Sequence, residues 1–384
     1  MNFLLIPDKF KNSISAKEVS AAISRGLVKV WSQCNITAIA ASDGGDGFLE
    51  AIQKSQNLEE RSVETVDPLS RRIISPYLFD GATNTAYLEL ANTSGVQLLK
   101  ESELDIMNAS TLGTGIMIGK AIERGARTIY LGIGGSATND GGMGIAHALG
   151  YRFLDQMGNM LLPVGKNLPK ICGIESTQLS VELDHVAFFA VNDVSNPLYG
   201  PHGAAHVYAE QKGAKNDDMD ILDKGLENLA KIVKKDIGID MAKSPGSGAA
   251  GGAAYGLGVF CRAKFIKGTD FIFEIADVAS ILESNKIDYI VTGEGKLDNQ
   301  TFEGKLIKGV MELGRRYQIP VIAICGKLEV GAELPRKYGI LDVLEIHHSG
   351  QSLQYSMENA AILIEKEIYT YFLDLPKTDK HHKI

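Results

Sequence analysis

Short apolar runs that each end near Gly, Asp or Ser recur at both ends of the chain, and they constrain its fold more than any other feature. Each run holds about four to six apolar or β-branched residues, the length of a strand buried on both faces of a parallel sheet. The runs are NFLLIPD (2–8), NITAIAASDGG (35–45), IDYIVTGEG (287–295), IPVIAICGK (319–327) and DVLEIHHSG (342–350).

Helix signals alternate with these strands. Ser15 and Glu18 form a capping box before one amphipathic segment, and apolar spacing near 3.6 recurs in 47–55, 306–318 and 356–373. The two chain ends together therefore predict five strands and five helices, as in a flavodoxin-like doubly wound sheet. We expect an α/β protein with two domains, the first of which is this parallel sheet, built from residues 1–61 and 285–384.

The middle of the chain, residues 62–284, predicts an inserted mixed α/β domain. The segments 61–80 and 84–96 alternate like antiparallel strands, while 126–135 and 185–194 resemble buried strands that end at polar loops. Ligands of doubly wound sheets bind beyond the carboxyl ends of the strands. We therefore expect the active site in a cleft between the two domains.

Composition narrows the range of partners. The 384 residues carry a net charge of −8, which argues against nucleic acid or an anionic membrane. No apolar run approaches the ~20 residues of a membrane span. The four cysteines have no metal-binding or redox spacing, and the first apolar run ends at Pro7 without a basic region before it. We expect a cytoplasmic protein that acts on small molecules, and the sequence leaves a homodimer open.

Glycine clusters mark loops where the backbone approaches something closely. The chain has 41 glycines, concentrated at 132–144 and 246–258. The stretch GIGGSATNDGG (132–142) predicts a phosphate cradle, or alternatively a tight connection that needs positive φ. For the second cluster, close packing of a small-residue helix is slightly favoured over an anion loop. The glycines that we assign to phosphate or nucleotide are Gly134, Gly135, Gly248, Gly251, Gly293 and Gly295.

The loops after the strands also combine carboxylates with lysines, as phosphoryl transfer requires. Asp193 lies in a loop whose course is fixed by two prolines, which suits a catalytic base or a metal ligand, with an ordinary Asx turn as the alternative. Glu294 and Asp298 are placed to bind Mg²⁺, and Lys305 to neutralise a phosphoryl group. The alternative is that Asp298 caps the next helix.

A dinucleotide site is a second interpretation of the first glycine loop. Gly132, Gly134 and Ala137 fit the pattern G-x-G-x-x-G/A, and Asp155 lies near the position of a ribose-binding acid. However, residues 138–142 interrupt the helix that such a site needs. An NAD(P)-dependent oxidoreductase of a small hydroxy acid is therefore one alternative. A non-catalytic two-domain protein that binds small anions is another.

Seven motifs in a fixed order indicate a family. They are PDKFKNSISAKEV (7–19), DGGDG (43–47), LGTG (112–115), GIGGSATNDGG (132–142), NDVSNPLYGPHGAAHVYAEQKGA (192–214), PGSGAAGG (245–252) and TGEGKLDNQTFEGK (292–305). Over essentially its full length the chain resembles the type I glycerate kinases. It departs from them at Lys9, where Ser is common, at Asp46, where Glu is common, and at Leu306–Ile307, where a proline is usual.

The resemblance implies a kinase that uses ATP and Mg²⁺ to phosphorylate D-glycerate, with 2-phosphoglycerate favoured over 3-phosphoglycerate as product. Our working hypothesis makes Asp193 the base, with Lys305 stabilising the transferring phosphoryl group. Asp43 is the third catalytic residue that we assign, as one of the carboxylates that could hold Mg²⁺. The residues that we assign to substrate are Lys9, Lys11, Ser136 and Asn139, and those assigned to Mg²⁺ are Asp46, Glu294 and Asp298.

Overall fold

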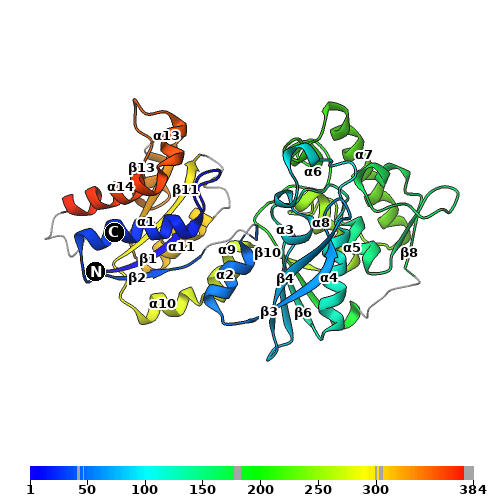
Figure 1. The fold of residues 1–384 in the computed structure, drawn as a ribbon, viewed down its shortest axis with the longest axis horizontal. Coiled ribbons are helices and arrows are strands. Elements are labelled where there is room, and N and C mark those ends of the chain that lie inside the picture. Colours follow the sequence, from blue (N-terminus) through cyan, green and yellow to red (C-terminus); the bar gives the residue numbers. More distant parts are fainter. Residues whose placement is uncertain are drawn as a thin grey trace. The chain divides into compact units, whose positions relative to one another are not determined.

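The computed structural model describes residues 1–40, 44–45, 47–176, 183–298, 301, 306–331 and 333–375. The chain divides into two compact units (Figure 1). The first comprises Met1–Ser42, Glu50–Gln56 and Ile272–Ile384, and the second comprises Asp43–Leu49 and Asn57–Phe271. The sequence predicted domain borders at 61/62 and 284/285. The assignment of domains stays a prediction.

A five-stranded parallel sheet forms the centre of the first unit. Its strands are β1 (Asn2–Pro7), β2 (Asn35–Ala38), β11 (Tyr289–Leu297), β12 (Val321–Leu328) and β13 (Ile340–Glu345). Their spatial order is β13-β12-β11-β1-β2, with every neighbouring pair parallel. Counted along the chain, this is the order 2-1-3-4-5 of a doubly wound sheet. The predicted α/β class is confirmed.

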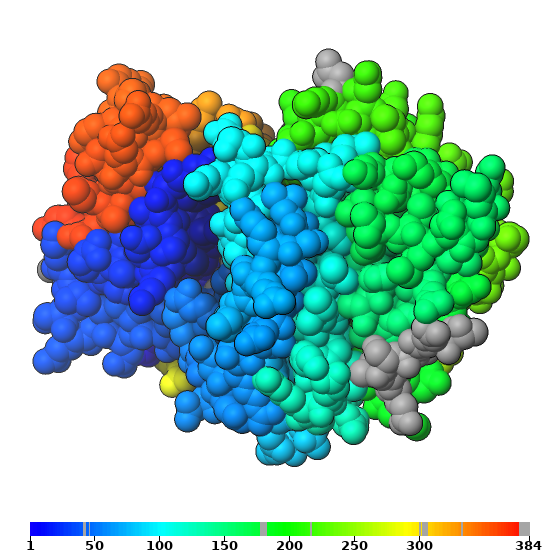
Figure 2. All heavy atoms as spheres, turned by 45° about the vertical axis from the view of Figure 1, so that its right-hand side comes forward, coloured from blue at the N-terminus to red at the C-terminus, as the bar shows by residue number. Residues whose placement is uncertain are grey.

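Helices α1 (Ala16–Val30) and α14 (Ala360–Asp374) pack together on one face of this sheet (Figure 1). Their apolar residues share a buried cluster with alternate residues of the strands, among them Ile322. The predicted capping box is present, since Ser15 N donates to the Glu18 carboxylate at 2.8 Å. In Figure 2 the blue N-terminal atoms and the orange-red C-terminal atoms of this unit lie against each other. Both chain ends therefore build one core.

The opposite face of the sheet is also buried. Ala323, the next residue along β12, packs with Ile307 and Met311 of α11 (Leu306–Tyr317). Burial on both faces explains why the strands are continuous apolar runs. The other helices with residues in this unit are α2 (Phe48–Ser55), α9 (Gly268–Ile275), α10 (Val278–Ser284), α12 (Glu333–Lys337) and α13 (Leu353–Glu358).

A six-stranded mixed sheet forms the second unit, in the order β10-β9-β6-β5-β4-β3. Its strands are β3 (Glu59–Val66), β4 (Arg72–Asp80), β5 (Thr85–Glu89), β6 (Thr128–Gly132), β9 (Ala187–Val191) and β10 (Lys264–Ile266). The β3–β4 and β4–β5 pairs are antiparallel, and the others are parallel. The antiparallel strands predicted in 61–80 and 84–96 are thus confirmed.

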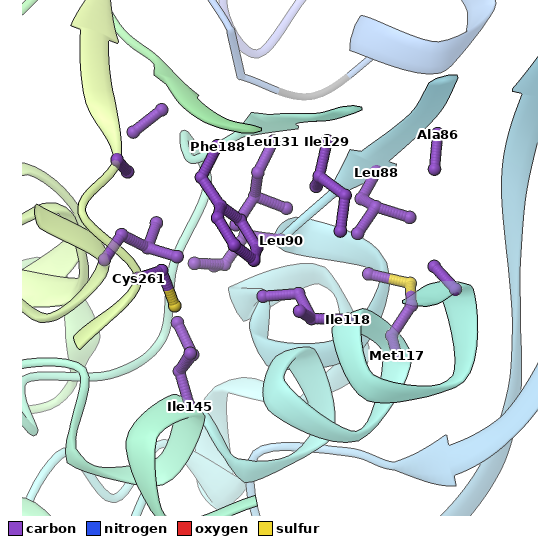
Figure 3. Close-up of a cluster of buried hydrophobic side chains, with 14 of the residues drawn as sticks. Ala86, Leu88, Leu90, Met117, Ile118, Ile129, Leu131, Ile145, Phe188 and Cys261 are labelled. Atoms are coloured by element: carbon purple, nitrogen blue, oxygen red, sulfur yellow. The ribbon is translucent and has the colours of Figure 1, made fainter. Parts of the chain in front are cut away.

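The core of the second unit lies between this sheet and helix α4 (Leu112–Glu123). Figure 3 shows Leu88, Leu131 and Phe188 of the sheet pointing toward Met117 and Ile118 of α4. A further buried cluster joins α5 (Met143–Ala148), α7 (Asn216–Asp236) and α8 (Ala253–Phe260). This second core holds the helices that follow the glycine loops.

The remaining elements of the second unit are short. They are the strand pair β7 (Arg152–Leu154) and β8 (Gly173–Glu175), helices α3 (Ala91–Ser94) and α6 (Ala204–Tyr208), and the 3₁₀ helices Val96–Leu98, Glu101–Glu103, Gly165–Lys170, Leu183–His185, Glu210–Lys212 and Ala249–Gly252. Across the described ranges, no helix combines the length and apolar character that crossing a membrane demands.

Candidate active site

One edge of the second unit's sheet gathers several of the predicted motifs. Strands β5, β6, β9 and β10 are parallel, so the loops that follow them share this edge, where ligands bind in such sheets. Gly134 N donates to Gly44 O at 2.9 Å. The Gly44 backbone in turn lies against Val191, the last residue of β9. Gly44 and Gly45 of the DGGDG motif, the GIGGSATNDGG loop and the end of β9 therefore lie together.

The close approach of a second backbone segment explains why position 134 is a glycine. A Cβ built there would lie 2.3 Å from Gly45 Cα, so only glycine admits the neighbouring segment. Gly135, Gly141 and Gly142 have φ of +71°, +64° and +74°, which favour glycine. The tight connection that we considered as an alternative is thus present. The assignment of Gly134 and Gly135 to phosphate stays a prediction.

Asp140 anchors its own loop. Its carboxylate is fully buried and accepts hydrogen bonds from Thr111 N (2.8 Å), Thr111 Oγ1 (2.9 Å), Gly142 N (3.1 Å) and Gly144 N (3.2 Å). Burial raises the pKa of Asp140, and the Thr111 and glycine donors oppose that rise. This set of donors explains why an aspartate occupies a loop otherwise suited to anions.

Ser136 and Asn139, both assigned to substrate, lie in the same loop and differ in exposure. Ser136 is 6% exposed, and its Oγ accepts a hydrogen bond from Lys212 Nζ at 2.7 Å. Asn139 is fully buried, and within the described part of the chain neither end of its amide has a hydrogen-bond partner. Ser136 therefore keeps a small exposed surface, whereas Asn139 has none.

The second glycine cluster packs against the other loops. A Cβ at Gly248 would lie 2.3 Å from Pro197 O, and one at Gly251 would lie 2.0 Å from Thr138 O. Gly251 also has a φ of +65°. The helix of small residues that we favoured for this stretch is present only as α8, since Ala250 and Gly251 before it have left-handed backbone angles. Both glycines thus have a packing role, and their assignment to phosphate stays a prediction.

Asp193 follows β9 and holds the start of α9. Its Oδ1 accepts from Gly268 N and its Oδ2 from Thr269 Oγ1, both at 2.9 Å. Negative charge at a helix N-terminus is favourable, so this carboxylate is held in one orientation. The Asx turn that we considered puts the acid in contact with its own loop, whereas these two hydrogen bonds come from a segment about 75 residues away.

In the first unit, Lys9 and Lys11 lie on the loop between β1 and α1. Asp8 N donates to Gly293 O at 2.8 Å, which holds this loop against β11. A Cβ at Gly295 would lie 3.3 Å from Lys11 N, and one at Gly293 would lie 2.3 Å from Ile324 O. The structure therefore brings the two lysines and these two glycines to one edge of the first sheet.

Glu294 and Asp298 meet at Thr301. The Thr301 hydroxyl donates to the Glu294 carboxylate, and Thr301 N donates to Asp298 Oδ1 at 3.3 Å. Asp298 also pairs with Lys296 Nζ at 3.1 Å. In the ranges that the structure describes, no group of three or more His, Cys, Asp or Glu is placed to hold a metal. Asp43, Asp46 and Lys305 lie outside those ranges.

Sequence reasoning missed Thr111, Glu89 and the contacts of Lys212. The Glu89 carboxylate accepts from Gly47 N and Leu49 N, both at 3.1 Å, and so fixes the start of α2 to β5. An acidic residue at the end of a buried strand was the available signal for Glu89. Thr111 and Lys212 carry no such local signal, because their partners lie far away in the chain.

The local structure disfavours a dinucleotide site. No helix begins in the described chain between Gly134 and Gly142, since α5 starts only at Met143. Asp155 Oδ1 accepts from Met157 N and Asn159 N within a turn, at 2.8 and 2.9 Å. The helix whose N-terminus would bind the pyrophosphate is therefore missing from this loop.

Comparisons with known proteins agree with the motifs. The family model described as "Glycerate kinase family" matches residues 3–372. The chain is 35% identical to a glycerate kinase of Bacillus subtilis, over 95% of each chain, and 34% identical to the glycerate 2-kinase of Escherichia coli, over 94% of each. A crystal structure of a Salmonella typhimurium protein matches with a TM-score of 0.79 and 32% identity, over 97% of both chains. The chain belongs to the glycerate kinase family.

Proposed function

We propose that this protein transfers the γ-phosphoryl group of ATP to a hydroxyl of D-glycerate, giving ADP and phosphoglycerate. The observation that carries the proposal is the family match over residues 3–372, with the shared motifs in the loops at the carboxyl edges of two sheets. We favour 2-phosphoglycerate as the product, and the name of the Escherichia coli relative, a glycerate 2-kinase, supports this choice.

Phosphoryl transfer needs positioning and neutralisation of charge more than covalent chemistry by the protein. We assign Lys9, Lys11, Ser136 and Asn139 to the substrate. We assign the glycine loops at 134–135, 248–251 and 293–295 to phosphate, which would bind backbone N–H groups that the fold leaves open. Gly134 N and Gly248 N are not among these, since they donate to Gly44 O and Asn196 O. Each of these glycines also has a packing or backbone reason to be glycine, so the two roles must coexist.

Asp193 is our candidate for the base that accepts the proton of the attacking hydroxyl, and Asp43 is a second catalytic carboxylate, which could hold Mg²⁺. The two hydrogen bonds that Asp193 accepts from Gly268 and Thr269 fix its orientation. A preorganised carboxylate suits general-base work. Lys305 would stabilise the charge on the transferring group.

Mg²⁺ is the cofactor that we propose with ATP. When bound, it neutralises charge on the phosphate oxygens. Glu294 and Asp298 offer oxygen ligands of the kind that it prefers, with Asp46 as a third. Thr301 would hold the first two carboxylates in place through its hydroxyl and its backbone N–H.

We also propose that residues 1–61 with 285–384 form one domain of flavodoxin type, and that 62–284 form a second domain inserted into it. The strand order 2-1-3-4-5 of the first unit supports the first part. The mixed sheet, which lies wholly within the second unit, supports the other.

A coupled assay of ADP release tests the reaction. D-Glycerate, L-glycerate and a panel of other hydroxy acids are compared at fixed Mg²⁺ and ATP. We expect the largest kcat/KM with D-glycerate, and the phosphorus NMR of the product assigns the hydroxyl. ADP release that is independent of every hydroxy acid would overturn the proposal.

A further inference from the structure

Lys212 is a buried ammonium that lies directly behind the GIGGSATNDGG loop. It ends the 3₁₀ helix Glu210–Lys212, and Gly213 then turns the chain with a φ of +88°. The residue is 4% exposed. Its Nζ donates to Ser136 Oγ at 2.7 Å and to Thr138 O at 2.8 Å. One side chain therefore holds two points of a loop that lies about 75 residues earlier in the chain.

The charge of this lysine is poorly compensated. Burial lowers the pKa of Lys212 to about 7, and the charge of Asp140 acts in the opposite direction. The Asp140 carboxylate already accepts hydrogen bonds from Thr111, Gly142 and Gly144. A buried cation costs free energy unless an anion or several acceptors stabilise it. An anion bound near Ser136 would supply that stabilisation.

The direction of the Lys212–Ser136 hydrogen bond follows from chemistry. When Lys212 is protonated its ammonium has donors only, so the Ser136 oxygen accepts. The Ser136 hydroxyl proton is then free to point elsewhere. In the part of the chain that the structure describes, the Ser136 hydroxyl donates to no protein acceptor. Ser136 retains 6% exposure, so this donor can meet a ligand at the sheet edge.

The backbone around Ser136 is rigid. Ala137 N donates to Ser94 O at 2.8 Å and Val96 N donates to Gly135 O at 3.0 Å, which pairs the loop with the chain after α3. The neighbouring polar groups are unsatisfied. Thr138 Oγ1 and both ends of the Asn139 amide are buried without a hydrogen-bond partner among the described residues. Buried polar groups are almost always paired, so unsatisfied groups side by side need an explanation.

We propose that Lys212 is a positioning residue which fixes the Ser136 hydroxyl as a hydrogen-bond donor to an anionic oxygen, carboxylate or phosphate, of a bound substrate. The identity of the two substrates rests on the proposed function. The role of Lys212 toward an anion rests on the contacts of Lys212 and Ser136. The lysine acts through the serine, and its charge strengthens the donor.

Calorimetric titration with two probes tests this role without turnover. D-Glycerate and a nonhydrolysable ATP analogue with Mg²⁺ are each titrated into the full chain. The variants are Lys212→Met, Ser136→Ala and the double variant, with Lys224→Met as the matched control because Lys224 is exposed on α7. We expect Lys212→Met to weaken the Kd of one probe by roughly 10–100-fold and to leave the other within about threefold. The affected probe identifies the anionic oxygen.

Coupling between the two residues separates positioning from a merely structural role. If Lys212 acts through Ser136, the Ser136→Ala variant weakens the same probe, and the double variant is about as weak as the weaker single variant. Unchanged Kd values for both probes in Lys212→Met would overturn the proposal. So would effects of the two substitutions that simply multiply, or a fall in kcat with both Kd values unchanged.

The Ser136→Ala variant keeps the test informative even if Lys212→Met folds poorly, because it removes only one hydroxyl. The proposed function fails separately. A wild-type protein that binds a probe through Lys212 yet releases no ADP with D-glycerate would contradict the kinase activity and leave the Lys212 inference standing.

Discussion

The backbone N–H and the side-chain hydroxyl of Thr111 both donate to one carboxylate oxygen of Asp140, at 2.8 and 2.9 Å. Thr111 directly precedes α4, and Asp140 lies in the GIGGSATNDGG loop. The Thr111 hydroxyl also accepts from Ile145 N at 3.0 Å, in α5. A single buried carboxylate therefore fixes where the loop meets α4, which precedes it in the chain, and α5, which follows it.

Replacing Asp140 with Asn should destabilise the fold strongly. The contacts at 2.8–3.2 Å around this carboxylate come from backbone N–H groups and a hydroxyl, so an amide NH₂ would face other donors. We expect a loss of about 2–4 kcal/mol in the free energy of unfolding, measured by urea denaturation.

Asp155→Asn is the matched control. Asp155 accepts from Met157 N and Asn159 N in a loop, and asparagine forms the same kind of turn. We expect a change within about 0.5 kcal/mol there. Equal denaturation midpoints for the two variants would contradict the anchoring role of Asp140.

Gly134→Ala should destabilise the second unit through a backbone clash. The new Cβ would lie 2.3 Å from Gly45 Cα, and neither backbone can move without disturbing the sheet edge. A loss of about 2–4 kcal/mol in the free energy of unfolding is expected, measured by thermal or urea denaturation.

Gly119→Ala is the comparison, because Gly119 lies within α4 with no atom within 4 Å of its added Cβ. That variant should be up to about 1 kcal/mol more stable than the wild type, owing to helix propensity. A Gly134→Ala protein as stable as the wild type would contradict this prediction, because it would show that the backbone shifts at little cost to admit the Cβ.

Asp193→Asn should lower kcat by roughly 10²–10⁴-fold if Asp193 is the base. The structure adds a second role, since Asp193 also holds Gly268 and Thr269 at the start of α9. Thr269→Val separates the two roles, because it removes one donor and keeps the carboxylate. We expect this variant to lose about 1 kcal/mol of stability and to keep kcat within a few-fold of wild type. Equal losses of kcat in both variants would assign Asp193 to structure alone.

The sequence predicted the strands better than it predicted the contacts of the site. The run 319–327 became β12 because residues such as Ile322 and Ala323 are buried on opposite faces, which leaves a continuous apolar signal. The Asp140–Thr111 contact spans 29 residues and the Lys212–Ser136 contact spans 76. Neither has a periodicity that could reveal it. Long-range packing decided which acid anchors a loop and which lysine is buried.

The burial of Lys212 also leads to a prediction of how the free energy of unfolding depends on pH. Burial lowers the pKa of Lys212 from 10.5 to about 7 in the folded protein. Between these values the unfolded chain binds a proton at this site that the folded protein has released. The free energy of unfolding should therefore rise with pH from about 7 to 10, at up to about 1.4 kcal/mol per pH unit from this group. Below pH 7 Lys212 is charged in both the folded and the unfolded state, so burial of the ammonium lowers the free energy of unfolding by its full amount.

Urea denaturation of wild type and Lys212→Met across pH 6 to 10 isolates the contribution of Lys212 to the free energy of unfolding. The difference between the two should shift in favour of the wild type as pH rises, whereas parallel curves would mean that Lys212 keeps an ordinary pKa and that its charge is stabilised in the folded state.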